Sequence, residues 1–262
     1  MKKYAICIPA SDDFALATAV LIHSLKKNLS AFNECQIVVP YNNLTEQGMK
    51  IIRKSCKDVV FKKPKNSDFY KHIPKTIYGP KNYDTYLSFE TFSQVGYERS
   101  IYLDADMLCT GDFSDLIRSD KPIIWKYPNL GILIVGDKYL TGQTYDNMIK
   151  TVIETDIKNR PDGDQVTCQR MFGPTNPDVQ VISELYNFQD FGAGGKGNNE
   201  EFAKKADEVK VVHYSGRRKP WAAVWDGEND NKNCIRFATL MNQNHAVKVW
   251  YKYYDLFREE CL

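Results

Sequence analysis

The sequence predicts an α/β fold, with a central, mostly parallel sheet flanked by helices. Two observations lead to this prediction. Short apolar runs alternate with helical patterns from the amino terminus onward, and two of the early runs are stopped by a proline. In addition, 262 residues are enough for one large core, and no repeat, low-complexity tract or clear linker divides them. We therefore expect a single domain over residues 1–262.

The individual elements follow from the periodicity of the apolar residues. Ser11-Asp12-Asp13 follows the first run and is a typical helix start. Segment 61–80 carries several lysines and three prolines with little periodicity, so we expect a surface excursion of functional use. The predicted strands are 4–9, 35–39, 59–61, 100–103, 123–125, 130–135 and 209–214, and the predicted helices are 14–29, 45–56, 83–96 and 138–156.

The charge and composition of the chain argue against several classes of partner. The 35 Lys and Arg against 33 Asp and Glu leave a net charge of +2, which gives no reason to expect nucleic acid. No run approaches the ~18 apolar residues of a transmembrane segment, and the start MKKYAICIPASDD has too short an apolar core for a signal peptide. Seven cysteines without a CxxC pair suit neither a disulfide framework nor a zinc cluster. We expect a cytoplasmic protein with reduced thiols.

An aspartate pair ends one of the apolar runs, in the stretch IYLDADMLCTGDF. In strand geometry, Asp104 and Asp106 would project to the same side. Unit charges ~4 Å apart interact by ~4 kcal/mol at an effective dielectric near 20, which a divalent cation would compensate. Ligands of open α/β sheets also bind beyond the carboxyl ends of the strands. The alternative is a turn cap at Asp104 beside a solvated Asp106.

A second cluster, HYSGRRKPW, begins at the end of a late apolar strand. His213 could ligate a metal, Gly216 would let backbone approach a ligand, and Lys219 could reach an anionic oxygen. A nitrogen ligand beside carboxylates favours manganese over magnesium, with magnesium as the second choice. The alternative is a solvated basic turn next to a buried histidine.

Three further stretches carry polar or aromatic residues of interest. In PDGDQ, Asp164 and Gln165 offer a carboxylate and an amide to sugar hydroxyls, although a helix cap explains the same pattern. Asn129, just before a strand, is a similar candidate. The glycine cluster at 191–197 matches a phosphate-binding loop only loosely. The aromatic stretch 249–257 favours a helix on the core or a homodimer contact over a sugar-stacking platform.

Together these motifs resemble the glycogenin-like family of retaining glycosyltransferases, which have the Rossmann-like GT-A fold. The resemblance rests on YAICIPASDDF, YLDADM, NLGILIV, DGDQ and HYSGRRKPW, in the family's order, and covers positions from about 4 to 221. It implies a manganese-dependent enzyme with a uridine-diphosphate (UDP) sugar as donor. The implied metal ligands are Asp104, Asp106 and His213, and the implied diphosphate contacts are Gly216 and Lys219.

The resemblance also implies the remaining donor contacts and the groups at the reacting sugar. The uridine pocket would be lined by Ala10, Ser11 and Phe14, with Ala105 beside the donor, and the sugar would meet Asn129, Gly131, Asp164 and Gln165. Asp164, Gln165 and Lys219 would then be the catalytic residues. Retention would proceed by front-face attack or through a covalent intermediate on Asp164.

Two departures from the family pattern bear on the donor and the acceptor. Ser88 stands where glycogenin members carry a basic residue near the donor. Positions 188–212 hold no tyrosine, which argues against a glycogenin-type self-glucosylating primer. We expect the acceptor to be a glycan, a polysaccharide or a small molecule. The alternatives are a UDP-sugar-binding protein without efficient turnover and a metal-dependent nucleotidyltransferase or phosphohydrolase.

Overall fold

The computed structural model describes residues 2–72, 80–154, 163–190, 196–215, 219–222 and 244–262. Its strands are β1 (Tyr4–Cys7), β2 (Cys35–Pro40), β3 (Val60–Lys62), β4 (Arg99–Leu103), β5 (Met107–Cys109), β6 (Ile123–Trp125), β7 (Ile132–Gly136), β8 (Val179–Val181), β9 (Phe188–Gln189) and β10 (Val211–His213). Its α-helices are α1 (Ala15–Asn28), α2 (Glu46–Ser55), α3 (Ser67–His72), α4 (Ser114–Ile117), α5 (Gly142–Glu154), α6 (Gly163–Met171), α7 (Lys196–Lys205) and α10 (His245–Cys261). Its 3-10 helices are η1 (Asp12–Phe14), η2 (Phe32–Glu34), η3 (Pro80–Ser93), η4 (Asp137–Tyr139) and η5 (Glu184–Tyr186).

Seven strands form the central sheet, in the order β3-β2-β1-β4-β7-β6-β8. The pairs β2–β3, β1–β2, β1–β4 and β6–β8 are parallel, and β7 runs antiparallel to both of its neighbours. The predicted α/β class with a mostly parallel sheet is therefore confirmed.

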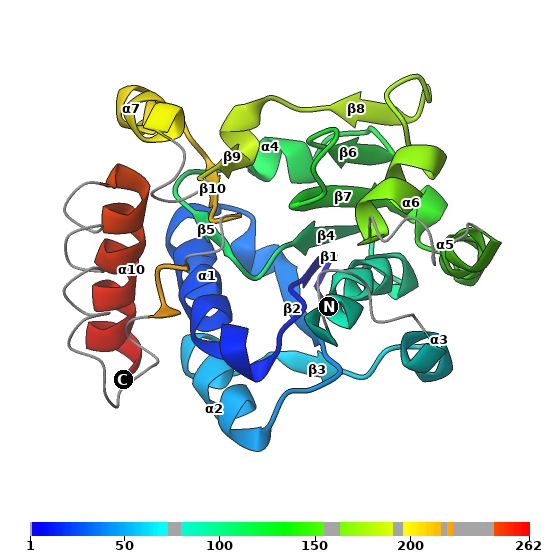
Figure 1. The fold of residues 1–262 in the computed structure, drawn as a ribbon, viewed down its shortest axis with the longest axis horizontal. Helices are drawn as coiled ribbons and strands as arrows, with labels where there is room; N and C mark the ends of the chain where they lie inside the picture. Colours follow the sequence, from blue (N-terminus) through cyan, green and yellow to red (C-terminus); the bar gives the residue numbers. More distant parts are fainter. Residues whose placement is uncertain (1, 73–79, 155–162, 191–195, 216–218, 223–243) are drawn as a thin grey trace.

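Helices cover both faces of this sheet (Figure 1). On one face, Ile6 of β1 and Ile101 of β4 lie in a fully buried cluster with residues of α1, α2 and α4. On the other face, Tyr102 of β4 and Trp125 of β6 pack with aromatic and aliphatic residues of α3, η3, α5 and α6. Because both faces are buried, the strands read as continuous apolar runs, which is the pattern that revealed them in the sequence.

A small second sheet, in the order β5-β10-β9, lies beyond the end of β4. Strand β10 runs antiparallel to β5, with His213 opposite Met107, and parallel to β9. The backbone amide of Tyr214 also donates to the Asp106 carbonyl over 2.8 Å. This sheet fixes the start of the HYSGRRKPW stretch against the DAD stretch, although about a hundred residues separate them in the chain.

The structure differs from the predicted elements in three places. The segment after β3 is not only a surface excursion, because α3 buries Phe69 and Tyr70 in the core. The predicted helix at 83–96 is a 3-10 helix that ends at Ser93, and the predicted helix at 138–156 begins only at Gly142, after η4. The strands β5, β8 and β9 have only two or three residues each, which is too short for a periodicity signal.

The aromatic carboxyl-terminal stretch forms α10, which packs beside α1 as predicted (Figure 1). Trp250 and Phe257 are fully buried there, and the Tyr251 hydroxyl donates to the Pro220 carbonyl over 2.7 Å. A homodimer stays a prediction.

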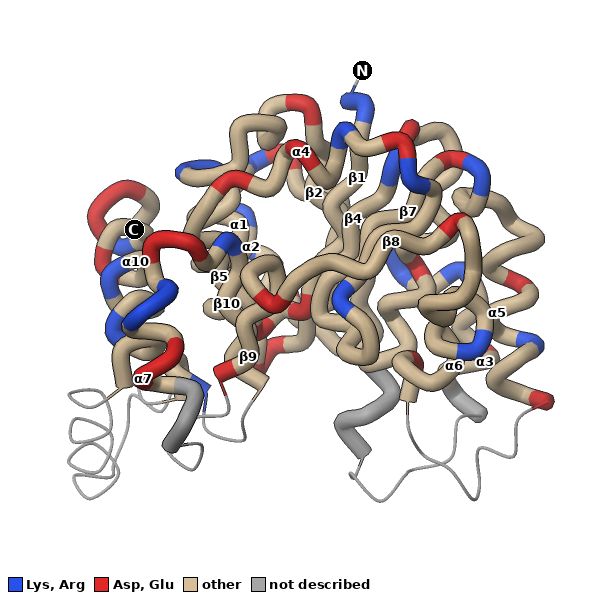
Figure 2. The backbone as a smooth tube through the Cα atoms, turned by 90° about the horizontal axis from the view of Figure 1, so that it is seen from above, with Lys and Arg blue, Asp and Glu red and all other residues tan. Residues whose placement is uncertain are grey.

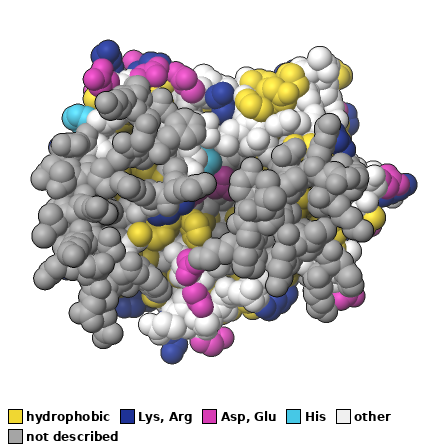
Figure 3. All heavy atoms as spheres, in the orientation of Figure 1, with side chains coloured by type: hydrophobic (Ala, Val, Ile, Leu, Met, Phe, Trp, Pro, Cys, Tyr) yellow, Lys and Arg dark blue, Asp and Glu magenta, His cyan; other side chains and the backbone are white. Residues whose placement is uncertain are grey.

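Charged residues of both signs are interspersed along the described backbone (Figure 2) and over the visible face (Figure 3). In the same described residues, no helix is both long enough and apolar enough to cross a membrane. The six cysteines that the structure describes are free thiols, and Cys234 lies outside those residues.

Candidate active site

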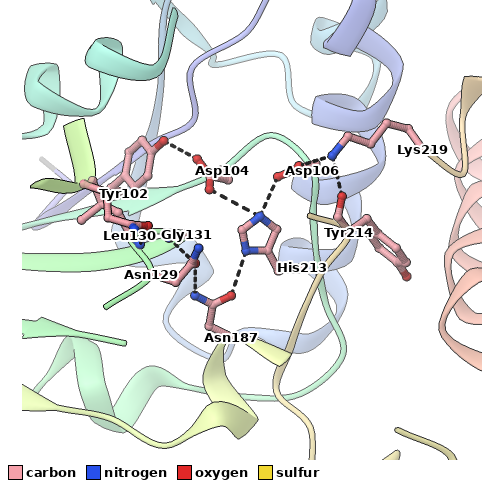
Figure 4. A network of polar contacts seen from close by, with 11 residues as sticks. Tyr102, Asp104, Asp106, Asn129, Leu130, Gly131, Asn187, His213, Tyr214 and Lys219 are labelled. Carbon is pink, nitrogen blue, oxygen red and sulfur yellow. Dashed lines mark hydrogen bonds and ion pairs between the residues drawn. The ribbon is translucent and has the colours of Figure 1, made fainter. Parts of the chain in front are cut away.

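The two aspartates lie in a turn directly after β4. Strand geometry stops at Leu103, and the Met107 amide donates to the Asp104 carbonyl over 3.2 Å. The expectation that strand alternation aligns the two carboxylates is therefore wrong in detail: the turn between β4 and β5 brings them to the same place. The Tyr102 hydroxyl donates to Asp104 Oδ1 and holds that carboxylate from the side of the sheet (Figure 4).

His213 completes the group from the end of β10. Its Nε2 lies 3.5 Å from Asp104 Oδ2 and 3.2 Å from Asp106 Oδ1, and its side chain is 5% exposed. One ligand atom from each of the three residues lies within 4.8 Å of the others (Figure 4). The site predicted from the two motifs is thus assembled in three dimensions.

The two carboxylates of this group lie close together, and their pKa values depend on the neighbouring His213 and Lys219. Burial and the neighbouring Asp106 raise the pKa of Asp104 against the opposing effect of His213. Burial also acts to raise the pKa of Asp106, but His213 and Lys219 outweigh it and hold that pKa at about 2. Burial alone would lower the pKa of His213, whereas the two carboxylates raise it above its ordinary value. The two carboxylates therefore favour the protonated form of the imidazole.

Lys219 supplies a second positive charge. Its Nζ donates to Asp106 Oδ2 over 2.6 Å and to the Tyr214 carbonyl over 2.5 Å. The Lys219 side chain is 20% exposed. Gly216, the other predicted diphosphate contact, lies outside the described residues.

The amino-terminal stretch that resembles a uridine pocket lies against the end of the same motif. Ala10 is buried after β1, whereas Ser11 and Phe14 are half-buried around η1. The rings of Phe14 and Trp221 meet edge to face at 5.4 Å, and Trp221 Nε1 donates to the Asp13 carbonyl over 3.1 Å. The first and last motifs of the chain are therefore in direct contact.

The predicted sugar-facing residues come from α6 and from the loop before β7. Burial raises the pKa of Asp164 to about 7, with the nearby Ser88 hydroxyl opposing the rise and Asp104 adding to it. Ser88 is 1% exposed and makes no hydrogen bond of normal geometry among the described residues, although its hydroxyl lies near enough to affect Asp164. Gln165 Oε1 accepts from the Leu130 amide over 3.4 Å, which ties α6 to the stretch containing Asn129.

Asn129 and Gly131 lie beside His213. The Asn129 carboxamide oxygen accepts from the Gly131 amide over 3.0 Å. A Cβ atom on Gly131 would stand 2.6 Å from His213 Nδ1, so only glycine allows the ring to lie this close. Whether either residue touches a sugar stays a prediction.

Comparisons with known proteins show what the chain is similar to. Residues 5–123, a little under half of the chain, match the model of glycosyl transferase family 8. Over this segment the chain is similar to that family. A curated relative is the glycosyltransferase GlyE of Streptococcus pneumoniae serotype 4, which is 24% identical over 139 residues, or 47% of this chain and 34% of GlyE.

Solved structures show that the fold extends beyond the matched segment. The crystal structure of GlyE has a TM-score of 0.66 at 17% identity and covers 99% of this chain and 63% of GlyE. The galactosyltransferase LgtC, crystallised with donor and acceptor sugar analogs, has a TM-score of 0.64 at 17% identity and covers 92% of this chain and 96% of LgtC. The chain spans less than two thirds of GlyE. These likenesses confirm the GT-A fold.

Two residues of the candidate site were missed from the sequence. Tyr102 could have been found, since it lies in β4 only two positions before Asp104. Asn187 bonds to both His213 and Asn129, but it sits in an irregular stretch between η5 and β9 that carries no pattern. Its role becomes visible only when three distant segments are brought together.

Proposed function

We propose that this protein is a member of glycosyl transferase family 8 and a manganese-dependent retaining glycosyltransferase. It moves a sugar from a UDP-sugar to the hydroxyl of a glycan, a polysaccharide or a small molecule. The observation that carries the proposal is the convergence of Asp104, Asp106 and His213, with Lys219 beside them. The alternative of a turn cap beside a solvated aspartate does not account for a histidine and a lysine aimed at the same carboxylates.

The donor atoms fit a divalent cation. Two carboxylates and one imidazole suit manganese better than magnesium, which prefers oxygen ligands and keeps its waters. A cation held there would supply charge stabilisation for the departing nucleotide diphosphate. Lys219 would leave Asp106 and donate to the diphosphate oxygens, which adds a positive charge where negative charge develops.

The residues near the transferred sugar divide into hydrogen-bonding groups and a titratable acid. Gln165 and Asn129 lie on facing segments, joined through the Leu130 amide, and would orient the sugar by its hydroxyls. Asp164, with a pKa of about 7, exists partly as the neutral acid near neutral pH. The neutral form would donate a hydrogen bond to the sugar and the ionised form could act as a nucleophile, so the proposal includes both front-face attack and a covalent intermediate on Asp164.

Two other functions remain as alternatives. A UDP-sugar-binding protein without efficient turnover would keep the metal group but would have no need for the Asp164–Gln165 pair. A nucleotidyltransferase or phosphohydrolase would also use paired carboxylates, a cation and a lysine. A glycogenin-type primer is disfavoured, because positions 188–212 hold no tyrosine.

The nature of the released nucleotide separates these functions. The protein is incubated with a panel of UDP-sugars, manganese and candidate acceptors, and the nucleotide products are separated by chromatography. The proposal expects uridine diphosphate, released slowly to water and faster with the correct acceptor. Uridine monophosphate or pyrophosphate would identify phosphoryl chemistry, and donor binding by calorimetry without any release would identify a binding protein.

A further inference from the structure

A chain of hydrogen bonds connects the backbone before β7 to the inner nitrogen of His213 (Figure 4). The Gly131 amide donates to Asn129 Oδ1 over 3.0 Å, and Asn187 Nδ2 donates to the same oxygen over 2.7 Å. Asn187 Oδ1 then lies 2.9 Å from His213 Nδ1. Asn187 is 1% exposed, so bulk water does not compete for these bonds.

The direction of every bond in this chain follows from its first donor. A backbone amide can only donate, so the atom of Asn129 that faces Gly131 must be the carboxamide oxygen. Asn187 must therefore turn its NH2 group toward that oxygen and its own oxygen toward the imidazole. Among the residues that the structure describes, the partner of the Asn187 oxygen is His213 Nδ1, which must carry the hydrogen of this bond.

The geometry of Gly131 holds the ring in place while the bonds set its protonation. A Cβ atom at this position would stand 2.6 Å from His213 Nδ1 and 2.9 Å from Cε1, closer than real contacts allow. The Gly131 carbonyl accepts from the Asp104 amide over 3.0 Å. The same glycine thus touches the imidazole and fixes the backbone of an aspartate that faces it.

We propose that Asn187 is a positioning residue that keeps His213 in the tautomer with hydrogen on Nδ1. The lone pair of the neutral ring is then on Nε2, which faces Asp104 and Asp106. The tautomer can be measured without a metal and does not depend on the proposed function. The binding of a metal to Nε2 rests on the proposed function. Partners that orient a ligating histidine in this way are worth about 10- to 100-fold in metal affinity.

The experiment has two readouts on one set of variants. Nitrogen NMR of isotope-labelled histidine is recorded on the metal-free protein at an alkaline pH where the imidazoles are neutral. The chain has four histidines, and a His213→Gln sample assigns the signal of His213. Manganese affinity is measured by calorimetry on the same samples. The variants are Asn187→Leu, which is similar in size and makes no hydrogen bond, and Asn187→Asp, which keeps an acceptor oxygen.

The expected result is an Nδ1–H tautomer in the unaltered protein and in Asn187→Asp. Asn187→Leu should show loss of this tautomer and a manganese affinity lower by about 10- to 100-fold. Asn176→Ala serves as the matched control, because Asn176 also ties a loop together by two hydrogen bonds but lies away from His213, and it should change neither readout.

An Nε2–H tautomer in the unaltered protein would overturn the proposal, and this measurement needs no variant to fold. An unchanged tautomer or an unchanged affinity in a folded Asn187→Leu protein would overturn it as well. Neither result depends on sugar transfer, so a failure here is distinguishable from a failure of the proposed function, which would appear as no nucleotide release while the tautomer is as expected.

Discussion

Lys219 Nζ lies 2.6 Å from Asp106 Oδ2, so the lysine of the last motif neutralises a carboxylate of the DAD motif 113 residues earlier. The same carboxylate also faces His213 at 3.2 Å. His213 and Lys219 therefore both face the carboxylates that would bind a divalent cation. In the proposed function, Lys219 pairs with Asp106 until the donor binds and then donates to its diphosphate, and it cannot do both at once.

This double role predicts opposite effects of Lys219→Ala on two affinities. Manganese alone should bind at least as tightly as before, up to about tenfold tighter, because a competing cation is removed and tenfold corresponds to ~1.4 kcal/mol. Uridine diphosphate with manganese should bind more weakly, because a cation that faces the diphosphate is lost. Both are measured by calorimetry, with Lys210→Ala, directly before β10, as a control. Weaker binding of manganese alone would contradict the competition.

Manganese affinity should fall as the pH is lowered. The carboxylates raise the pKa of His213, so the metal-free ring carries a proton below that value, and a ligand must first release it. Asp106, with a pKa of about 2, stays ionised throughout and adds nothing to the dependence. Calorimetry between about pH 8 and about pH 6, in buffers of different ionisation enthalpy, reads affinity and proton release together. A constant affinity without proton release would mean that His213 is not a ligand.

Asp164 should make the free energy of unfolding depend on pH. Its pKa is raised from 3.8 to about 7, so the folded protein holds this proton more tightly than the unfolded chain does. The resulting stabilisation is present at pH values below the unfolded pKa and is lost as the pH rises through about 7. The free energy of unfolding of Asp164→Asn, relative to that of the unaltered protein, should therefore rise by at most about 3 kcal/mol between about pH 5 and about pH 8.

Denaturant unfolding at the two pH values measures this gain. Asp146→Asn is the control, because Asp146 has an exposed side chain and should give the same difference at both pH values. Parallel stability curves for Asp164→Asn and the unaltered protein would show that Asp164 ionises normally.

Glu90 should be among the most costly side chains to remove. It is fully buried in η3, and its carboxylate accepts from the Lys65 amide over 3.1 Å, the Tyr145 hydroxyl over 2.7 Å and the Ser93 hydroxyl over 3.0 Å. Glu90→Ala leaves these donors without their acceptor and should reduce the free energy of unfolding by roughly 3–5 kcal/mol. The exposed Glu98→Ala, measured by the same denaturant unfolding, should cost less than ~1 kcal/mol. A loss of that small size for Glu90→Ala would show that its donors find other partners.

The parts of the fold that could be predicted are those with a local signal. The runs at Tyr4 and Cys35 form the strands β1 and β2, and Ser11-Asp12-Asp13 marks the start of the helical segment between them, although the Ser11 side chain makes no capping hydrogen bond. The antiparallel β7 could not be predicted, because strand direction depends on the path of the whole chain. The turn at Asp104 was considered only as the alternative to a metal site, and the strand β5 after it was missed.

The candidate site also contains residues that the sequence predicts and residues that it does not. Asp104, Asp106, His213 and Lys219 stand in motifs whose composition is unusual enough to attract notice. The residues that orient these side chains do not stand in recognisable motifs. Asn187 acts through His213, which comes from another segment, so its role depends on contacts that the sequence does not display.

In the proposed function, the Asp104–Asp106–His213 group holds the cation that makes sugar transfer possible. The most direct test is the rate of uridine diphosphate release from the best UDP-sugar, titrated with manganese, in the unaltered protein and in Asp106→Ala. We predict a saturable manganese dependence in the unaltered protein and a loss of at least about 100-fold in Asp106→Ala, at the scale of removing a transition-state charge contact. Release by Asp106→Ala at an undiminished rate, with the same dependence on manganese, would contradict the claim.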